Sequence, residues 1–171
     1  KGGKAIGLCG IDGGLLSAKT ISPAYGRTGE VAKVDVTVVN NFLDQGYIPV
    51  IATVAQGADG LASVYSVSAN VAAAKLSVAL GAEKLIQLTD QESMLQNPDD
   101  PGAPMPELHL SKVPALIRSG VISQIMVHKV NCSVEAVRSG VKSATFLDGT
   151  VPHAILLELL SDEGIGTMLT H

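Results

Sequence analysis

The feature that most limits the fold is an alternation of helical and extended segments, punctuated by glycine. Helical patterns cover residues 35–45, 71–80 and 123–139, and each is followed directly by a glycine, at positions 46, 81 and 140. Glycine readily takes the positive φ that ends a helix. An apolar run predicted to be a strand follows each helix, at residues 47–54, 84–89 and 141–147. This alternation predicts an α/β fold, a three-layer αβα sandwich with a largely parallel sheet.

The remaining segments complete this prediction. The run 47–54 shows no polar alternation, so we expect a strand covered on both faces. Asp12-Gly13-Gly14 predicts a hairpin-type turn between the apolar runs 5–8 and 15–18. Further predictions are a turn at 56–60, a returning strand at 61–67, a loop at 96–106, a helix at 112–118 capped by Ser111, a helix at 152–160 and a last strand at 167–169.

Composition restricts the class of protein. The chain has 171 residues, which suits one domain, and 46% of them are hydrophobic with no Trp, so we expect an aliphatic core. The formal charge is −4 with no basic block, and nothing predicts binding to nucleic acid. No apolar run approaches the roughly 18 residues of a membrane span. Cys9 and Cys132 form no metal-binding motif, and we interpret them as two buried, reduced thiols.

Lys129 interrupts an apolar helical stripe. The apolar positions of the helix 123–139 lie three or four residues apart, at Ile122, Ile125, Met126, Val130, Val134 and Val137. Lys129 follows Ile125 by four residues and Met126 by three, so it borders or enters the stripe. One interpretation is a lysine at the edge of the stripe whose ammonium group reaches water. The other is a cation held at a site, as the transfer of a phosphoryl group requires.

Polar residues gather at three further places. Ser66, Ser68 and Asn70 precede the Ala-rich helix 71–80, which Asn70 could cap. Thr89 and Asp90 follow at the end of the strand 84–89, where α/β sheets bind ligands. The tail contains Glu158, Asp162-Glu163, Gly164 and Gly166, and taken alone it is a helix end followed by a glycine turn with solvated acids.

These segments, in this order, resemble the acetylglutamate kinases of the amino acid kinase family. The resemblance covers nearly the whole chain and includes segments 7–16, 29–31, 46–51, 79–85 and 141–168, while 97–102 and 129–132 look most like plant-type and cyanobacterial members. It implies that residues 1–171 form a single domain similar to the C-terminal, ATP-binding half of such a kinase. We expect the N-terminal substrate half, with its Lys-x-Gly-Gly strand, to be absent from this chain.

The resemblance also implies a reaction and its residues. Members of the family phosphorylate the γ-carboxylate of N-acetyl-L-glutamate with ATP, and Mg²⁺ accompanies the nucleotide. Lys129 would stabilise the phosphoryl group in transfer, and Thr89 and Asp90 would lie near the nucleotide. Ser66 replaces the family's substrate-binding Asn. Asn70 replaces the Asp that organises the catalytic lysines, and an amide carries no charge with which to do so.

Two further regions of the resemblance bear on binding. Gln124 and Ile125 replace a glycine pair at the start of the helix 123–139, and we expect their side chains to narrow or block that end of the site. In arginine-regulated members, the tail positions that match Glu158, Glu163, Gly164 and Gly166 help to form an effector site. Carboxylates suit this role because they bind a guanidinium group through paired hydrogen bonds.

The sequence and the resemblance therefore leave three alternative functions. The first is a catalytically degenerate relative, kept as a structural or regulatory subunit that associates with other subunits or with copies of itself. The second is an active acetylglutamate kinase of arginine biosynthesis, and the third is an arginine-binding regulatory module. The resemblance implies a soluble protein of a plastid or another organelle, or of the cytoplasm if the source is bacterial.

Overall fold

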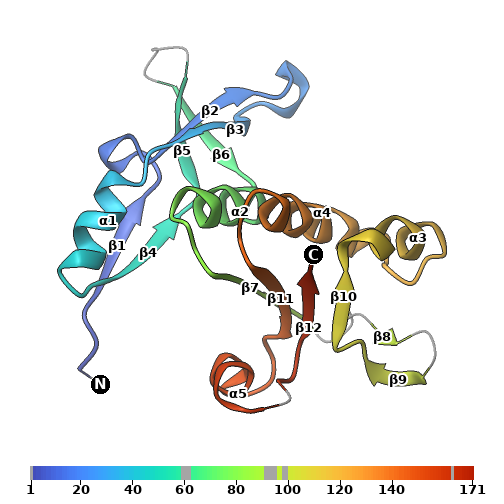
Figure 1. Cartoon of the computed structure of the whole chain (residues 1–171). Helices are drawn as coiled ribbons and strands as arrows, with labels where there is room; N and C mark the ends of the chain where they lie inside the picture. The colour runs from blue at the N-terminus through green and yellow to red at the C-terminus, as the bar shows by residue number, and fades with distance from the viewer. Residues whose placement is uncertain (1, 59–62, 91–95, 98–99, 163) are drawn as a thin grey trace. The chain divides into compact units, whose positions relative to one another are not determined.

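The computed structural model describes residues 2–58, 63–90, 96–97, 100–162 and 164–171 (Figure 1). The chain forms two compact units, Lys1–Leu80 and Gly81–His171. Each unit combines helices with β-sheet, so the predicted α/β class is confirmed. Parallel and antiparallel pairs occur in both units, and the sheets are therefore mixed rather than largely parallel.

Six strands of the first unit form a parallel pair and a small closed barrel. The pair joins β1 (Ala5–Cys9) to β4 (Ile48–Ala52). The barrel has the order β2 (Leu16–Thr20), β3 (Thr28–Val34), β6 (Val64–Val67) and β5 (Val54–Gly57). A Cβ atom on Gly29 would lie 2.8 Å from Cβ of Tyr65, so glycine is required where β3 approaches β6.

Two helices complete the first unit. They are α1 (Thr37–Asp44) and α2 (Ala69–Ala79), close to their predicted positions. Gly46 and Gly81 follow them with φ of 76° and 61°, as the glycine pattern predicted. The core is aliphatic apart from one tyrosine and consists of Leu8, Leu15, Leu16, Ala18, Val31, Val39, Ala55, Tyr65, Val67, Ala72 and Leu76.

Two predictions for this unit are wrong. The turn at Asp12-Gly13-Gly14 does not form a hairpin, because β1 pairs with β4 and β2 pairs with β3. These residues form the 3₁₀ turn η1 (Asp12–Gly14), in which Gly13 and Gly14 have positive φ and direct the chain from the parallel pair into the barrel. The strand β4 is not covered on both faces. Its pleat places Ile48 and Val50 on one face, where they are 61% and 60% exposed.

The second unit contains a four-stranded mixed sheet. Its order is β10 (Glu107–His109), β12 (Thr167–Thr170), β11 (Ser143–Asp148) and β7 (Lys84–Thr89). The strands β7 and β11 are parallel, with Thr89 opposite Asp148, so both end at the same edge of the sheet. The strand β12 runs antiparallel to β11 and parallel to β10.

The described residues of this unit form three α-helices, α3 (Val113–Arg118), α4 (Gln124–Arg138) and α5 (Ala154–Leu160). The long helix α4 contacts β11 and β12 and buries Met126, Val130, Val134 and Val137. Gly140 follows it with φ of 115°. No helix in the described part of the chain is long and apolar enough to cross a membrane.

Two further predictions need correction here. Ser111 does not cap α3, because it lies inside the 3₁₀ turn η4 (Leu110–Lys112), where its N–H donates to Nδ1 of His109. The segment predicted as a loop at 96–106 contains the antiparallel strands β8 (Gln96–Asn97) and β9 (Asp100–Pro104). Proline density concealed this pairing, since proline is disfavoured in most strand positions.

Candidate functional site

The end of β7 and the first half of α4 bring two predicted site residues near each other. Nζ of Lys129 lies 3.4 Å from the carbonyl oxygen of Leu88, to which it donates a long hydrogen bond. Oγ1 of the next residue, Thr89, lies 3.9 Å from Sδ of Met126. Lys129 and Thr89 are both half-buried. The side chain of Lys129 therefore reaches the carboxyl edge of the sheet, where ligands of α/β sheets bind.

A glycine turn supports this edge. The N–H of Gly149 donates to the carbonyl oxygen of Thr89 at 2.7 Å, which ties the turn after β11 to the end of β7. A Cβ atom on Gly149 would lie 3.4 Å from both Cβ of Leu88 and the Thr89 oxygen, so the approach is close. Asp90 is exposed and interacts with other residues of the protein. The local geometry thus fixes the carbonyl group on which Lys129 rests.

The start of α4 differs from the prediction. Ile125 was expected in the buried stripe, but its side chain is 84% exposed, and the buried stripe begins at Met126. Gln124 is exposed as well. Neither side chain fills a space inside the described part of the second unit, so their effect on a ligand stays a prediction.

The predicted substrate-side residues lie in the first unit. Ser66 is exposed on β6, and its N–H donates to the carbonyl oxygen of Arg27. Asn70 does not cap α2 as predicted, because it is the second residue inside the helix and Ser68 occupies the N-cap position. On the same helix, Nζ of Lys75 donates to the carbonyl oxygen of Val31 at 2.7 Å. Asn70 is half-buried and presents a neutral amide where the family resemblance places a carboxylate.

The tail residue Glu158 binds the protein's own backbone. Its Oε2 accepts hydrogen bonds from the N–H groups of Ile165 and Gly166 at 3.0 and 3.1 Å. Its Oε1 lies 3.7 Å from Nζ of Lys84, and the Glu158 side chain is only 7% exposed. This carboxylate is therefore already engaged, whereas an arginine effector would need it free.

The tail glycines are needed for close packing. Gly164 has φ of 64°, and a Cβ atom there would lie 2.8 Å from Oε2 of Glu158. A Cβ atom on Gly166 would lie 2.6 Å from the carbonyl oxygen of Phe146 and would overlap Cδ2 of Leu147. Glu163, the remaining predicted effector residue, lies outside the described residues. The described tail thus has a structural reason for its glycines, and the effector role stays a prediction.

The two cysteines differ in burial, and neither belongs to a cluster of metal ligands among the described residues. Cys132 is buried, and burial, with a contribution from Glu135, raises the pKa of its thiol, so it stays neutral near pH 7. Cys9 is half-buried rather than buried as predicted, and both thiols are free. Within the described ranges, no group of three or more His, Cys, Asp or Glu residues could hold a metal ion.

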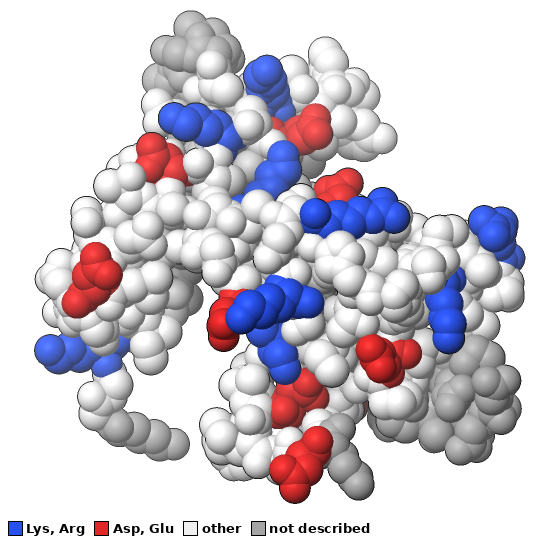
Figure 2. Space-filling model, viewed as in Figure 1, with Lys and Arg blue, Asp and Glu red and all other residues white. Residues whose placement is uncertain are grey.

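Charged side chains of both signs are interspersed on the face of the protein shown in Figure 2. Lys142 and Glu83 form an exposed ion pair at 2.5 Å, and this contact lowers the pKa of the Glu83 carboxyl group. Lys33 lies 3.9 Å from Asp35, a contact at the start of α1. Such exposed pairs contribute little to stability and indicate no binding site.

The sequence did not predict which groups contact Lys129 and Glu158. The Leu88 carbonyl and the Lys84 ammonium group carry no signal in the sequence, because their roles depend on strand register. The contact of Gly149 with Thr89 depends likewise on β7 and β11 being parallel neighbours.

Comparison with known proteins gives the following matches. The sequence model of the amino acid kinase family matches residues 1–148. An acetylglutamate kinase from Clostridium beijerinckii is 48% identical over 170 residues, which are 98% of this chain and 59% of that protein. Another from Prochlorococcus marinus (strain NATL1A) is 43% identical over 166 residues, 96% of this chain and 54% of that protein. The chain thus spans little more than half the length of these relatives.

Solved structures agree at the level of the fold. N-acetylglutamate synthase from Neisseria gonorrhoeae, complexed with coenzyme A and N-acetylglutamate, superposes with a TM-score of 0.83 at 24% identity, covering 99% of this chain and 38% of that one. Carbamate kinase from Giardia lamblia, bound to AMP-PNP, gives 0.66 at 15% identity, with 98% and 62% covered. At these identities the likeness concerns the fold alone.

Proposed function

The chain belongs to the amino acid kinase family, and we propose that it is an acetylglutamate kinase-like protein that binds a nucleotide but transfers its phosphoryl group poorly or not at all. The single observation that supports nucleotide binding is the position of Lys129, whose ammonium group rests on the Leu88 carbonyl at the carboxyl end of β7. The proteins named acetylglutamate kinase that are 43–48% identical to the chain support the choice of relative.

In this proposal Lys129 provides positive charge for the phosphates. Phosphoryl transfer asks little covalent chemistry of a protein, and catalysis depends on positioning and on fixed positive charge. ATP would supply the phosphoryl group, with magnesium bound to its phosphates. Lys129 would neutralise charge on the transferring group, and the Gly149 turn would hold the strand end that orients it.

The proposed loss of activity rests on substitutions relative to the family pattern. Asn70 cannot hold ammonium groups together as a carboxylate would, because its amide has no charge. Ser66 has a shorter side chain than the family's Asn at the substrate. Gln124 and the exposed Ile125 add bulk where the family has two glycines. Changes at several ligand positions, with the scaffold glycines present, favour a structural or regulatory role.

Association is part of the same proposal. The helix α5 exposes much apolar surface, with Leu156 54% and Leu160 80% exposed. Exposed apolar clusters of this kind are common where a protein meets another chain. We propose that the chain associates with other subunits or with copies of itself, which sedimentation velocity over a range of concentrations would detect.

An active kinase is the second candidate, and one observation favours it. Ile125 is 84% exposed and Gln124 is exposed as well, so neither side chain fills a space inside the described part of the second unit. A nucleotide at the end of β7 would then meet Lys129 without displacing either side chain.

Two measurements on the 171-residue chain separate the candidates. Calorimetry gives the Kd for ATP with Mg²⁺, and hydroxylamine trapping detects acylphosphate formed from N-acetyl-L-glutamate. We expect nucleotide binding without acylphosphate, and Lys129→Ala should weaken binding about tenfold or more, the value of one charge-assisted hydrogen bond. Lys142→Ala is the matched control, because Lys142 is 74% exposed and pairs only with Glu83 among the described residues.

Each outcome decides between the candidates. Acylphosphate formation that Lys129→Ala abolishes would establish the active kinase. Binding that is equal in the Lys129→Ala and Lys142→Ala variants would remove the proposed role of Lys129. The absence of any nucleotide binding would contradict both candidates.

A further inference from the structure

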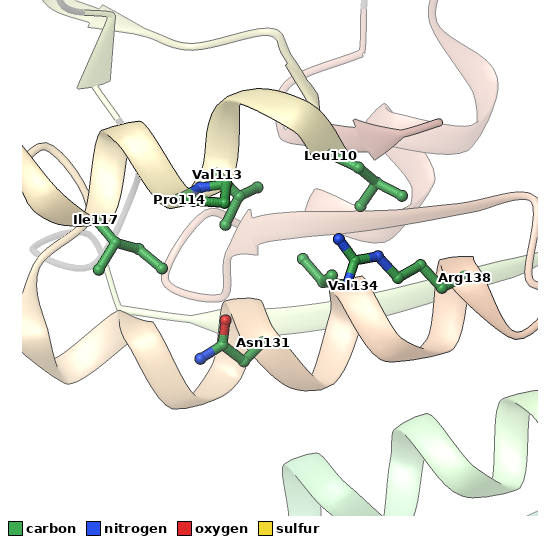
Figure 3. A pocket seen from close by; sticks show the side chains of 7 residues that line it. All are labelled: Leu110, Val113, Pro114, Ile117, Asn131, Val134 and Arg138. Carbon is green, nitrogen blue, oxygen red and sulfur yellow. The ribbon is translucent and has the colours of Figure 1, made fainter.

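A hollow of about 300 Å³ lies between two helical segments of the second unit (Figure 3). One wall is a single face of η4 and α3, with residues three or four apart: Leu110, Val113, Pro114 and Ile117. The other wall is the C-terminal half of α4, which contributes Asn131, Val134 and Arg138. Its volume is at the lower end of the roughly 300–1,000 Å³ of small-molecule sites.

The hollow has an apolar base and a cationic rim. Leu110, Val113 and Val134 are buried, at 6%, 3% and 7% exposure, and form the base. Arg138 and Asn131 are exposed. Figure 3 shows the guanidinium group of Arg138 beside Leu110 and Val134, and the Asn131 side chain directed toward α3. Within the described residues, Arg138 makes no ion pair or side-chain hydrogen bond.

We propose that this hollow binds a small carboxylic acid with an apolar body. A guanidinium group offers two parallel N–H donors that match the two oxygens of a carboxylate. The buried aliphatic base would take the apolar body, since burial of apolar surface is favourable. Asn131 supplies a neutral hydrogen-bonding group across the opening. No acidic side chain lines the hollow, so nothing there favours a cationic ligand.

The site differs from the end of β7. Asn131 follows Lys129 by two residues, and because each helical residue turns by about 100°, the two side chains leave α4 on different sides. Arg138 is the one charged residue that lines the hollow, and the base of the hollow is apolar. A chain of phosphates is usually bound by several N–H donors, such as successive backbone amides. The ligand is therefore a single carboxylate rather than a second nucleotide.

The test is an NMR titration of the isotope-labelled full chain with sodium hexanoate, hexan-1-ol and hexylamine. Hexanoate should shift the backbone amide signals of residues 110–117 and 131–138, and should bind about tenfold more tightly than hexan-1-ol, the expected value of a charge-assisted hydrogen bond. Hexylamine should bind no better than the alcohol. These comparisons use the unaltered protein and do not depend on the folding of a variant.

Variants then locate the interaction. Arg138→Gln should reduce hexanoate affinity to that of hexan-1-ol, while the control Arg118→Gln, at the exposed end of α3, should leave it unchanged. Ile117→Trp should fill the hollow and weaken both ligands. The proposal is wrong if hexanoate shifts neither segment, if hexylamine binds as tightly as hexanoate, or if Arg138→Gln leaves hexanoate binding unaltered.

Discussion

Replacing Glu158 by alanine tests whether one carboxylate holds the tail against the second unit. The change removes the acceptor of two backbone N–H groups, those of Ile165 and Gly166, and the partner of Lys84. A hydrogen bond to a charged group contributes about 1.5–3 kcal/mol, and we take the lower value for each because the tail is only part-buried. The Lys84 pair is at 3.7 Å and adds at most about 1 kcal/mol. We expect a loss of about 3–4 kcal/mol in the stability of the tail.

The assay is amide hydrogen exchange, read at Ile165 and Gly166. Local protection at these two amides should fall by roughly a hundredfold in the Glu158→Ala variant, the equivalent of about 3 kcal/mol. Lys84→Met is the matched control, because it removes the ion pair but leaves both backbone hydrogen bonds, and it should cost at most about 1 kcal/mol. Unchanged exchange at both amides in Glu158→Ala would refute the role of this carboxylate.

Three other perturbations test separate parts of the structure. Gly166→Ala should destabilise the second unit by about 2 kcal/mol or more, because the added Cβ has no space beside β11, and thermal unfolding measures it. Lys142→Met should raise the pKa of Glu83 toward its ordinary value, which NMR titration measures. Because the contact with Lys142 lowers this pKa in the folded state, its small stabilising effect is fully present above the ordinary pKa of a glutamate. That effect is lost as the pH falls through the lowered pKa of the folded state. An unaltered Glu83 titration would contradict this. Iodoacetamide should modify Cys9 before Cys132, whose buried thiol has a raised pKa, and the reverse order in mass spectrometry would show that the burial is wrong.

The sequence predicted the parts of the fold that depend on local pattern. The helices α1, α2 and α4 and the strand β7 were predicted within a few residues, because helical spacing and a following glycine act over short distances. The closed barrel was not predicted, because β2 pairs with β3 and β5 through register that no local pattern encodes. The exposure of Ile48 and Val50 also escaped prediction, since hydrophobicity alone does not say what covers a strand.

The candidate site residues were chosen from local patterns in the same way, and their roles stay predictions. The spacing of Lys129 from Met126 predicted that it borders or enters the apolar stripe, and in the structure its Nζ lies 3.4 Å from the carbonyl oxygen of Leu88. Its backbone partner could not be predicted, because a carbonyl group has no side-chain signature. Asn70 was recognised as unusual only through the family resemblance, and its position inside α2 rather than at the cap required the structure.

The residues proposed for nucleotide binding and those proposed for catalysis lie in different units. Lys129 and Thr89 belong to the second unit, while Ser66 and Asn70 belong to the first. Under the proposed function, Lys129 would attract phosphates at the end of β7, while the neutral amide of Asn70 would lack the charge of the family's Asp. Since binding energy accelerates a reaction only when it is greater in the transition state, such a protein would bind ATP and release it unchanged. This difference between Lys129 and Asn70, rather than the number of altered residues, is the reason for proposing a binding subunit ahead of an active kinase.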